Sequence, residues 1–266
     1  MDKIMQKATG NLFLDSLSPE SRATLLNLST AVSLPPGSVL YEPSVVPDYG
    51  YLLTSGIAST ITKASNGDSA EVGLIGHEGM VGSLQMLGPA PVPAESMVQI
   101  EATALRISLR EFRKIFQASE EIRERLLEFV QNEALTTIQI SGCHRFHGTE
   151  KRMCRWLLMV QDRVQTDELK LTHSFLALML GIRRPTATLV ARSLQEAGML
   201  EMRRGFFRVK DRKRMEAASC ECYEQVKGLY ENLYKRHSGF GSLHRKTKVV
   251  EQHVLPVKDR RSHRVI

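Results

Sequence analysis

Residues 171–194 constrain the fold of this chain most strongly, because they predict two short helices joined by a tight turn. Thr172 is placed to cap the first helix, and apolar residues recur at helical spacing up to Leu180. Gly181 stands where that helix must end, a position that often needs a positive φ. Pro185 fits the first position of the second helix, with extended backbone before it at Arg184.

The second predicted helix has an apolar inner face, formed by Ala187, Val190 and Leu194. Its other face is not acidic and carries Thr188, Leu189, Arg192 and Gln195. This is the layout of a helix-turn-helix, in which the second helix enters the major groove of DNA. An ordinary pair of packed amphipathic helices would give a similar pattern, so residues 171–194 alone do not distinguish it from a helix-turn-helix.

A hairpin follows the two helices and favours the DNA-binding interpretation. Residues 198–202 lead into residues 203–209, and both segments are typical of short strands that turn around Gly205. A helix-turn-helix followed by such a hairpin is a winged helix-turn-helix. We therefore expect this domain to occupy residues 149–236 and its recognition helix to lie near residues 184–197.

Charge is distributed unevenly along the chain, whose formal net charge is +7. Residues 1–150 hold 17 acidic against 11 basic side chains, a net −6, whereas residues 151–236 hold 10 against 18, a net +8. Residues 237–266 add a further net +5, from 2 acidic and 7 basic side chains. A polyanionic partner is therefore expected on the C-terminal side.

The N-terminal part predicts an antiparallel β-barrel or sandwich over residues 12–118, so the fold class is α+β. A short helix is expected from Pro19 to Leu28, capped by Ser18. Short strand patterns with turns then continue to about Leu109, and Asn66-Gly67 is a strong hairpin signal among them.

A long helix is expected from Glu120 to the helix-breaking pair Ser141-Gly142, within a segment of residues 119–148. An apolar stripe runs along it at nearly coiled-coil spacing, formed by Leu127, Val130, Ala134 and Ile138. The stripe could lie on the chain's own barrel. We favour a partner helix, because a two-fold dimer would present two recognition helices to adjacent major grooves about 34 Å apart.

The C-terminal region predicts a helix around Trp156 that packs the DNA-binding domain, and another from Arg212 to about Arg236. The basic segment 237–266 shows no periodicity, so we expect a disordered tail that strengthens nonspecific phosphate contact. Cys220 and Cys222 stand one residue apart on the last predicted helix, so their side chains would point in different directions. They are weak metal or redox candidates, and reduced thiols without a role are the preferred interpretation.

The order of barrel, long helix and winged helix-turn-helix resembles the family of the cyclic AMP receptor protein and the fumarate-nitrate reductase regulator, which are dimeric bacterial transcription factors. The resemblance covers residues 12–236 and is most specific in residues 171–200, where the Leu-Thr and Leu-Gly elements of the family pattern stand. It is also visible in residues 36–40 and 75–82.

The resemblance implies a set of DNA-facing residues at the turn and on the recognition helix. Arg184 could pair with guanine O6 and N7, and Leu189 could meet a thymine methyl. Arg192 or Thr172 could hold phosphates. The family's usual glutamate and arginine are replaced by Pro185 and Leu189, so the target sequence of the best-known members does not transfer. The full set of DNA-binding candidates is Arg183, Arg184, Pro185, Thr186, Thr188, Leu189, Arg192, Thr172 and Ser174.

The sensor end departs from the family pattern for cyclic nucleotides. Ser83 replaces the glutamate that would bind the ribose hydroxyl, and residues 88–95 contain no arginine for the cyclic phosphate. An anionic phosphate would be buried without a cation, so cyclic AMP and cyclic GMP are not expected ligands. No cysteine precedes Cys143 to hold an iron–sulfur cluster, and His77 with Met80 makes haem possible only in principle. No cofactor and no metal are expected, and the effector is unknown.

The expected partners are double-stranded DNA, a second copy of the chain, an unidentified small molecule and RNA polymerase as a further candidate. The alternative function is a protein-interaction module whose barrel docks a partner and whose basic half binds acidic protein or RNA. An enzyme is the weakest candidate, because the sequence assigns no orienting acid to His144 and His147 near Cys143, and close sequence spacing does not create a catalytic geometry. No signal peptide or membrane-spanning run is evident, so a cytoplasmic location is the default expectation.

Overall fold

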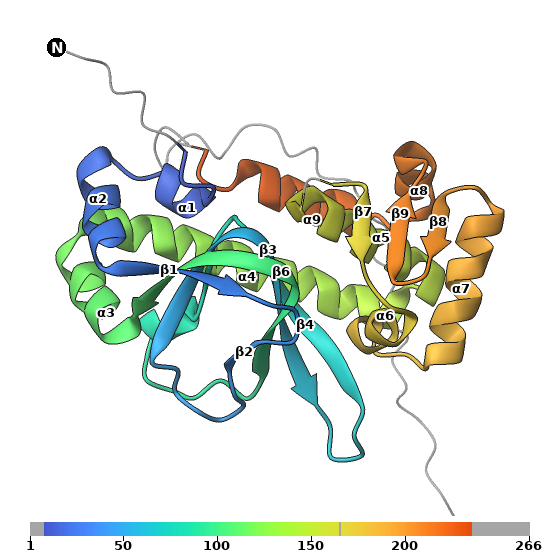
Figure 1. Ribbon diagram of the computed structural model, residues 1–266, viewed down its shortest axis with the longest axis horizontal. Coiled ribbons are helices and arrows are strands. Elements are labelled where there is room, and N and C mark those ends of the chain that lie inside the picture. Colours follow the sequence, from blue (N-terminus) through green and yellow to red (C-terminus); the bar gives the residue numbers. More distant parts are fainter. Residues whose placement is uncertain (1–7, 165, 236–266) are drawn as a thin grey trace, which may run out of the picture. The chain divides into compact units, whose positions relative to one another are not determined.

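The computed structural model describes residues 8–164 and 166–235, which combine an N-terminal antiparallel sheet with a helical C-terminal half (Figure 1). The predicted α+β fold class is confirmed. Two short helices come first, α1 (Leu12–Asp15) and α2 (Pro19–Asn27). Ser18 caps α2 as predicted, since its side chain accepts the main-chain N–H of Ser21.

The sheet contains six strands in the order β1-β6-β3-β4, with β2 paired to β6 and β5 paired to β3. We call these strands, residues 29–108, the β-roll. Their bounds are β1 (Ser29–Leu34), β2 (Val39–Tyr41), β3 (Tyr49–Lys63), β4 (Ser69–Ile75), β5 (Met80–Val81) and β6 (Glu95–Ser108), with a 3-10 helix η1 (Ser83–Met86) before β6.

Two strands are longer than their sequence patterns indicated. The short apolar runs on either side of Gly56 belong to one strand, β3, which pairs with β6 through several register shifts. Gly56 sits at one of these irregular positions with φ +73°, and a Cβ there would lie 2.3 Å from the carbonyl oxygen of Glu101. A glycine that looked like a turn is therefore a bulge within a continuous strand. The Asn66-Gly67 turn does connect β3 to β4, as predicted.

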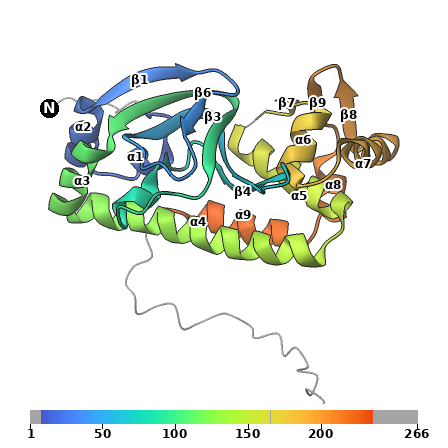
Figure 2. The ribbon, with the colours of Figure 1, turned by 90° about the horizontal axis from the view of Figure 1, so that it is seen from below.

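Helix α3 (Leu109–Ala118) leads into the long helix α4 (Glu120–Phe146). Helix α4 runs beneath the β-roll, and α9 (Cys222–Asn232) packs beside it (Figure 2). The prediction that Ser141-Gly142 ends this helix was wrong. The Ser141 hydroxyl donates to the carbonyl of Thr137 one turn earlier, so this polar side chain is accommodated within the helix. A single interior glycine costs only about 1 kcal/mol and does not break a long helix.

The C-terminal half contains α5 (Thr149–Val164), a three-stranded sheet in the order β7-β9-β8, and four further helices. The predicted wing hairpin is confirmed as β8 (Leu200–Arg203) and β9 (Phe206–Val209). The sequence reading did not include β7 (Glu168–Lys170), which pairs with β9. The remaining helices are α6 (His173–Leu180), α7 (Arg184–Glu196), α8 (Arg212–Ala218) and α9 (Cys222–Asn232).

The prediction of a single helix from Arg212 onward was also wrong, because residues 219–221 are not helical and separate α8 from α9. Cys220 therefore lies in the connecting segment rather than on a helix, and Cys222 is the first residue of α9. The expectation that the two cysteine side chains diverge rested on a continuous helix and does not hold. The predicted tail, residues 237–266, lies outside the described residues.

One hydrophobic core joins the helical half to the β-roll. Ile57, Ile61 and Leu74 from the sheet share a buried cluster with Trp156 and its neighbours on α5. Polar contacts cross the same boundary: the indole of Trp156 donates to Glu71 at 2.8 Å. The core that positions the DNA-binding half is therefore partly built by the sheet.

A buried ion pair lies at the same boundary. The guanidinium of Arg163 on α5 donates to the carboxylate of Glu78 at 2.6 Å, and both side chains are almost completely buried. Tyr230 of α9 stacks its ring against Arg163, at 5.0 Å from the ring centroid. In the described part of the chain, no helix is both long and apolar enough to cross a membrane.

Candidate nucleic-acid interface

The turn between α6 and α7 forms as its residues predict. The Thr172 side chain accepts the main-chain N–H of Phe175 at 3.1 Å, so Thr172 is the N-cap of α6. Gly181 ends the helix in the left-handed region with φ 61°, and the next N–H, from Ile182, returns to the carbonyl of Ala177. This cap fixes the direction in which the chain enters α7.

The start of α7 differs from the prediction by one residue. Arg183, not Arg184, is the extended residue before the helix, so Arg184 is the first helical residue and Pro185 the second. The carbonyl of Arg183 accepts the N–H of Ala187 at 3.1 Å, which closes the first turn. Pro185 does not oppose this arrangement, because the N–H it lacks would have no partner within the helix.

The outer face of α7 is open. Ala187, Ala191 and Leu194 are buried, while Val190, assigned to the inner face, is half-buried. Leu189 is 70% exposed. The other exposed candidates are Arg183, Arg184, Pro185, Thr186 and Arg192, together with Thr172 and Ser174 at the start of α6.

Two hydroxyls of the candidate set already have partners. Thr188 is half-buried, and its hydroxyl donates to the carbonyl of Arg184 at 3.1 Å. Thr172 uses its oxygen to accept a main-chain N–H, which leaves its hydroxyl proton free to donate to a ligand. Thr172 is therefore better placed than Thr188 to donate a hydrogen bond to a phosphate.

The electrostatics of this surface are positive. Partial burial lowers the pKa of His173, and the nearby charges of Arg184 and Arg192 lower it further. The same two guanidiniums are exposed, so their charge faces the solvent beside the α6 N-terminus. A helix N-terminus flanked by cations attracts phosphate.

The wing adds basic residues that the sequence reading did not assign to the site. Arg203 and Arg204 precede the turn at Gly205, and Arg208 and Lys210 follow on or just after β9. All four side chains are exposed, although Arg203 also pairs with Glu201 at 2.7 Å. The Arg-Arg-Gly sequence at a predicted turn was the signal that could have identified them.

The region that would hold a cyclic phosphate has Ser83 in place of the family's glutamate and no arginine in residues 88–95. Ser83 is buried at the first position of η1, behind Gly82 in the left-handed region. Arg113 of α3 reaches this region, but its guanidinium donates to the main-chain carbonyl of Gln85. That cation is therefore already engaged by the protein.

Two family models match this chain, one in its N-terminal half and one in its C-terminal half. Residues 31–119 match the family model described as a cyclic nucleotide-binding domain, and residues 151–218 match the one described as a Crp-like helix-turn-helix domain. The chain belongs to the Crp/Fnr family of regulators. It is a DNA-binding transcription regulator with an N-terminal domain of the effector-binding type.

Relatives of this regulator match about three quarters or more of its length at low identity. The CRP-like cAMP-activated global transcriptional regulator of Mycobacterium tuberculosis is 22% identical over 222 residues, covering 81% of this chain and 98% of that protein. A solved Crp/Fnr-family regulator from Eubacterium rectale has a TM-score of 0.61 at 16% identity, covering 79% of this chain and 99% of its own. The c-di-GMP-responsive regulator CLP of Xanthomonas campestris also has a TM-score of 0.61, at 18% identity over 73% of this chain and 100% of its own. These structures support the shared fold.

Proposed function

We propose that this regulator reads operator DNA with α7, acting as a homodimer that presents two copies of that helix to successive major grooves. The observation that carries the proposal is the open outer face of α7, where Leu189 is 70% exposed beside free arginine side chains. Exposed guanidiniums beside an apolar side chain on the second helix of a helix-turn-helix are the groups that contact phosphates and base edges in the major groove.

The residues on this face are assigned different tasks. Arg184 forks to guanine O6 and N7, and Leu189 contacts a thymine methyl group. Arg192 and Thr172 hold phosphates, with Ser174 beside them at the start of α6. Arg183, Pro185, Thr186 and Thr188 complete the surface, with Thr188 contributing shape more than hydrogen bonds because its hydroxyl is engaged.

The wing is assigned to the phosphate backbone. Arg203, Arg204 and Arg208 are exposed on the hairpin that follows α7. Guanidiniums on a wing add affinity that depends on salt and carries little sequence information. We therefore expect base readout from α7 and salt-dependent affinity from the wing.

The dimer is assigned to α4. The buried face of this helix contacts its own chain through Ile122, Leu126 and Phe129. The opposite face is apolar and exposed, and Ile138 on it is 69% exposed. The other exposed apolar side chains on α4 are Leu127, Leu135 and Phe146. A second copy of α4 would cover this stripe in the manner of a coiled coil.

The domain boundaries proposed for this molecule are 12–118 for the sensor, 119–148 for the dimerisation helix and 149–236 for the DNA-binding domain. An effector bound in the β-roll would shift α4 and thereby the spacing of the two recognition helices. We assign no effector class, because the cyclic-phosphate region lacks the family's glutamate and arginine. A cytoplasmic location and RNA polymerase as a partner belong to the same proposal.

The test is a salt titration on DNA. An operator is first selected from genomic fragments by the purified full-length protein, and its affinity is then compared with that of a scrambled duplex of equal length. We expect a preference of at least about 10³-fold for the operator that persists with excess competitor DNA. Equal affinity for the two duplexes at all salt concentrations would leave only the polyanion-binding alternative.

A further inference from the structure

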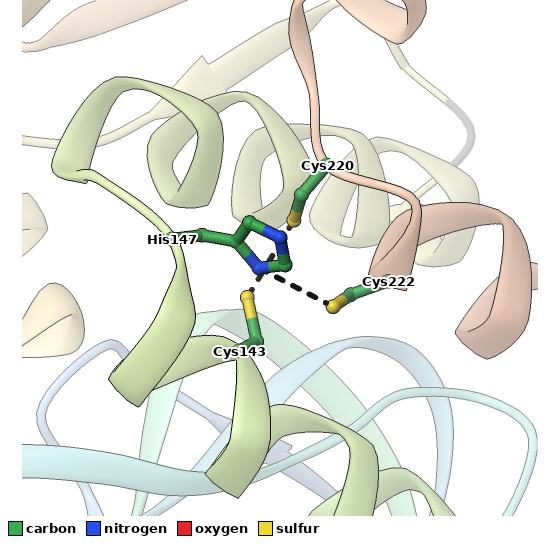
Figure 3. A group of neighbouring side chains, drawn as sticks. All are labelled: Cys143, His147, Cys220 and Cys222. Atoms are coloured by element: carbon green, nitrogen blue, oxygen red, sulfur yellow. Dashed lines mark hydrogen bonds between the residues drawn. The ribbon is translucent and has the colours of Figure 1, made fainter. Parts of the chain in front are cut away.

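Four potential metal ligands meet at the end of α4. Cys143 and His147 come from the last turn of α4 and its cap, and Cys220 and Cys222 come from the break between α8 and α9 (Figure 3). One ligand atom from each residue lies within 4.8 Å of every other. The three cysteines are almost completely buried and form a small cluster of their own.

The distances suit one tetrahedral ion. The Sγ atoms of Cys143 and Cys220 are 3.5 Å apart, and the Sγ of Cys222 is 3.6 Å from Nδ1 of His147. Zinc bonds of about 2.3 Å to sulfur and about 2.0–2.1 Å to nitrogen place tetrahedral ligands roughly 3.4–3.8 Å from one another. An iron–sulfur cluster distributes its ligands over several irons and needs a wider arrangement than this.

The surroundings of the cluster hold the ligands in the orientation that a metal needs. Nε2 of His147 lies 3.1 Å from a carboxylate oxygen of Glu221, so this nitrogen carries the proton and Nδ1 is left with its lone pair toward the sulfurs. Such a carboxylate–histidine pair is the usual outer support of a zinc-bound histidine. The amide of Gln139 donates to the sulfur of Cys222 at 3.2 Å, so a hydrogen bond holds this sulfur in place.

The charge balance also fits a cation bound by thiolates. Three thiolates and one neutral imidazole around a divalent ion leave a net charge of about −1 in a buried place. Arg155 of α5 is 2% exposed, and its charge acts on both Cys143 and Cys220. Its Nε atom has no hydrogen-bond partner among the described residues. A buried guanidinium of this kind is explained by an anionic neighbour.

We propose that Cys143, His147, Cys220 and Cys222 bind one zinc ion. The ion closes a loop of more than seventy residues, since it joins the α4–α5 connection to the α8–α9 connection. Asn132 of α4 already holds α9 through a hydrogen bond to the carbonyl of Leu229 at 2.8 Å, one side of the same contact. The zinc therefore fastens the two ends of the winged domain to the end of the long helix.

A disulfide is the competing interpretation of the close pair Cys143–Cys220. It would use two of the four groups and would leave Cys222, His147 and its carboxylate partner without a role. The complete set of four convergent ligands favours the metal. The experiment below distinguishes the two, because a disulfide lowers the intact mass and removes two titratable thiols.

The first measurement is metal content. Full-length protein is produced in zinc-supplemented medium, freed of any affinity tag and dialysed, and its metals are determined by mass spectrometry. We expect close to one zinc per chain in the wild type and in Cys154→Ala, which removes the remaining cysteine, a buried one outside the cluster. Cys222→Ser and His147→Ala should lose most of the zinc. In the Cys154→Ala protein, a chelator should make three protected thiols reactive.

A variant at an exposed position avoids the risk that ligand variants fail to fold. The Glu221 side chain is 74% exposed, so Glu221→Ala should leave the fold intact while lowering zinc affinity about 10-fold in a chelator competition. Glu224→Ala, at another exposed glutamate in the first turn of α9, should leave the affinity unchanged.

Three results would overturn the zinc site: less than stoichiometric metal after zinc supplementation and reconstitution under reducing conditions, iron in place of zinc, or an intact mass that shows a disulfide. Equal affinity in Glu221→Ala and Glu224→Ala would remove the role of the carboxylate. None of these measurements uses DNA, so failure of the zinc site leaves the proposed DNA-binding function untouched.

Discussion

Arg184 carries the most specific prediction at the scale of single residues. It is the first residue of α7, it is exposed, and its side chain lies beside a helix N-terminus. We expect Arg184→Ala to reduce operator binding by about 1–3 kcal/mol, because a bidentate contact to guanine discriminates by about that amount. Binding to a scrambled duplex should fall much less, as measured by fluorescence anisotropy at fixed salt.

The matched control for this variant is Arg110→Ala, which removes an exposed arginine on α3 in the N-terminal half. It should leave both affinities unchanged. If Arg184→Ala weakens operator and scrambled DNA equally, Arg184 contacts only phosphate and the base-reading role moves to another residue of α7.

Glu71 carries a prediction about pH. Burial raises the pKa of Glu71 to about 7, although Ser59 and Trp156 bond to its carboxylate and Arg155 and Arg163 lie nearby. Trp156 donates to one carboxyl oxygen at 2.8 Å and the Ser59 hydroxyl donates to the other at 2.6 Å, so both oxygens of this buried group have partners. Glu71 therefore links the β-roll to α5 through a carboxyl group that is protonated below about pH 7 in the folded protein.

The sign of the effect follows from proton counting. As pH rises from about 4.5 to about 7, the unfolded chain releases the Glu71 proton and the folded chain keeps it, so stability falls over this range. Glu71→Gln keeps a neutral side chain and avoids this loss. We expect the free energy of unfolding of the variant, relative to that of the wild type, to increase by about 1–3 kcal/mol between about pH 5 and about pH 8. Urea unfolding experiments measure this change.

Glu20→Gln serves as the control, since it makes the same change at an exposed residue of α2. The difference in free energy of unfolding between Glu20→Gln and the wild type should be the same at about pH 5 and about pH 8. A Glu71→Gln variant that is equally destabilised at about pH 5 and about pH 8 would show that folding does not raise the pKa of Glu71.

At the scale of elements, α4 carries the prediction. Ile138 lies on the exposed apolar stripe, opposite the face that contacts its own chain. We expect Ile138→Glu to convert a dimer into a monomer at micromolar concentrations, because two like charges would meet across the two-fold axis. Sedimentation velocity measures the change, and affinity for a full operator should fall while affinity for one half-site is kept.

Val45→Glu provides the comparison, because it places the same charge at another exposed apolar residue, outside α4. It should remain dimeric. A monomeric wild-type protein, or an Ile138→Glu variant that stays dimeric, would exclude α4 as the dimer interface.

The same scale shows what the sequence could and could not predict. Elements whose ends carry strong local signals were predicted well: Ser18 and Thr172 cap their helices, and Gly181 and Gly205 turn the chain where expected. Boundaries that depend on tertiary context were predicted poorly. Gly56 is a bulge inside β3 and Gly142 lies within α4, since packing overrides a local tendency to break.

At the scale of the whole molecule, the sequence predicted which residues of α7 are exposed more readily than which residues meet in the interior. The recognition face is contiguous in sequence, so periodicity alone groups its side chains. The contacts Trp156–Glu71 and Arg163–Glu78 each join residues 85 positions apart, and no local pattern relates them. The cysteine cluster is similar, because Cys143 and Cys220 approach only through the packing of α9 on α4.

The most direct test of the account is a footprint of the full-length protein on its selected operator. Two α7 helices related by two-fold symmetry should protect two half-sites with inverted sequence, centred about 10 base pairs apart. Arg184→Ala should lose protection at one equivalent guanine in each half-site. A single asymmetric protected site, or protection that α7 substitutions leave unchanged, would contradict the account.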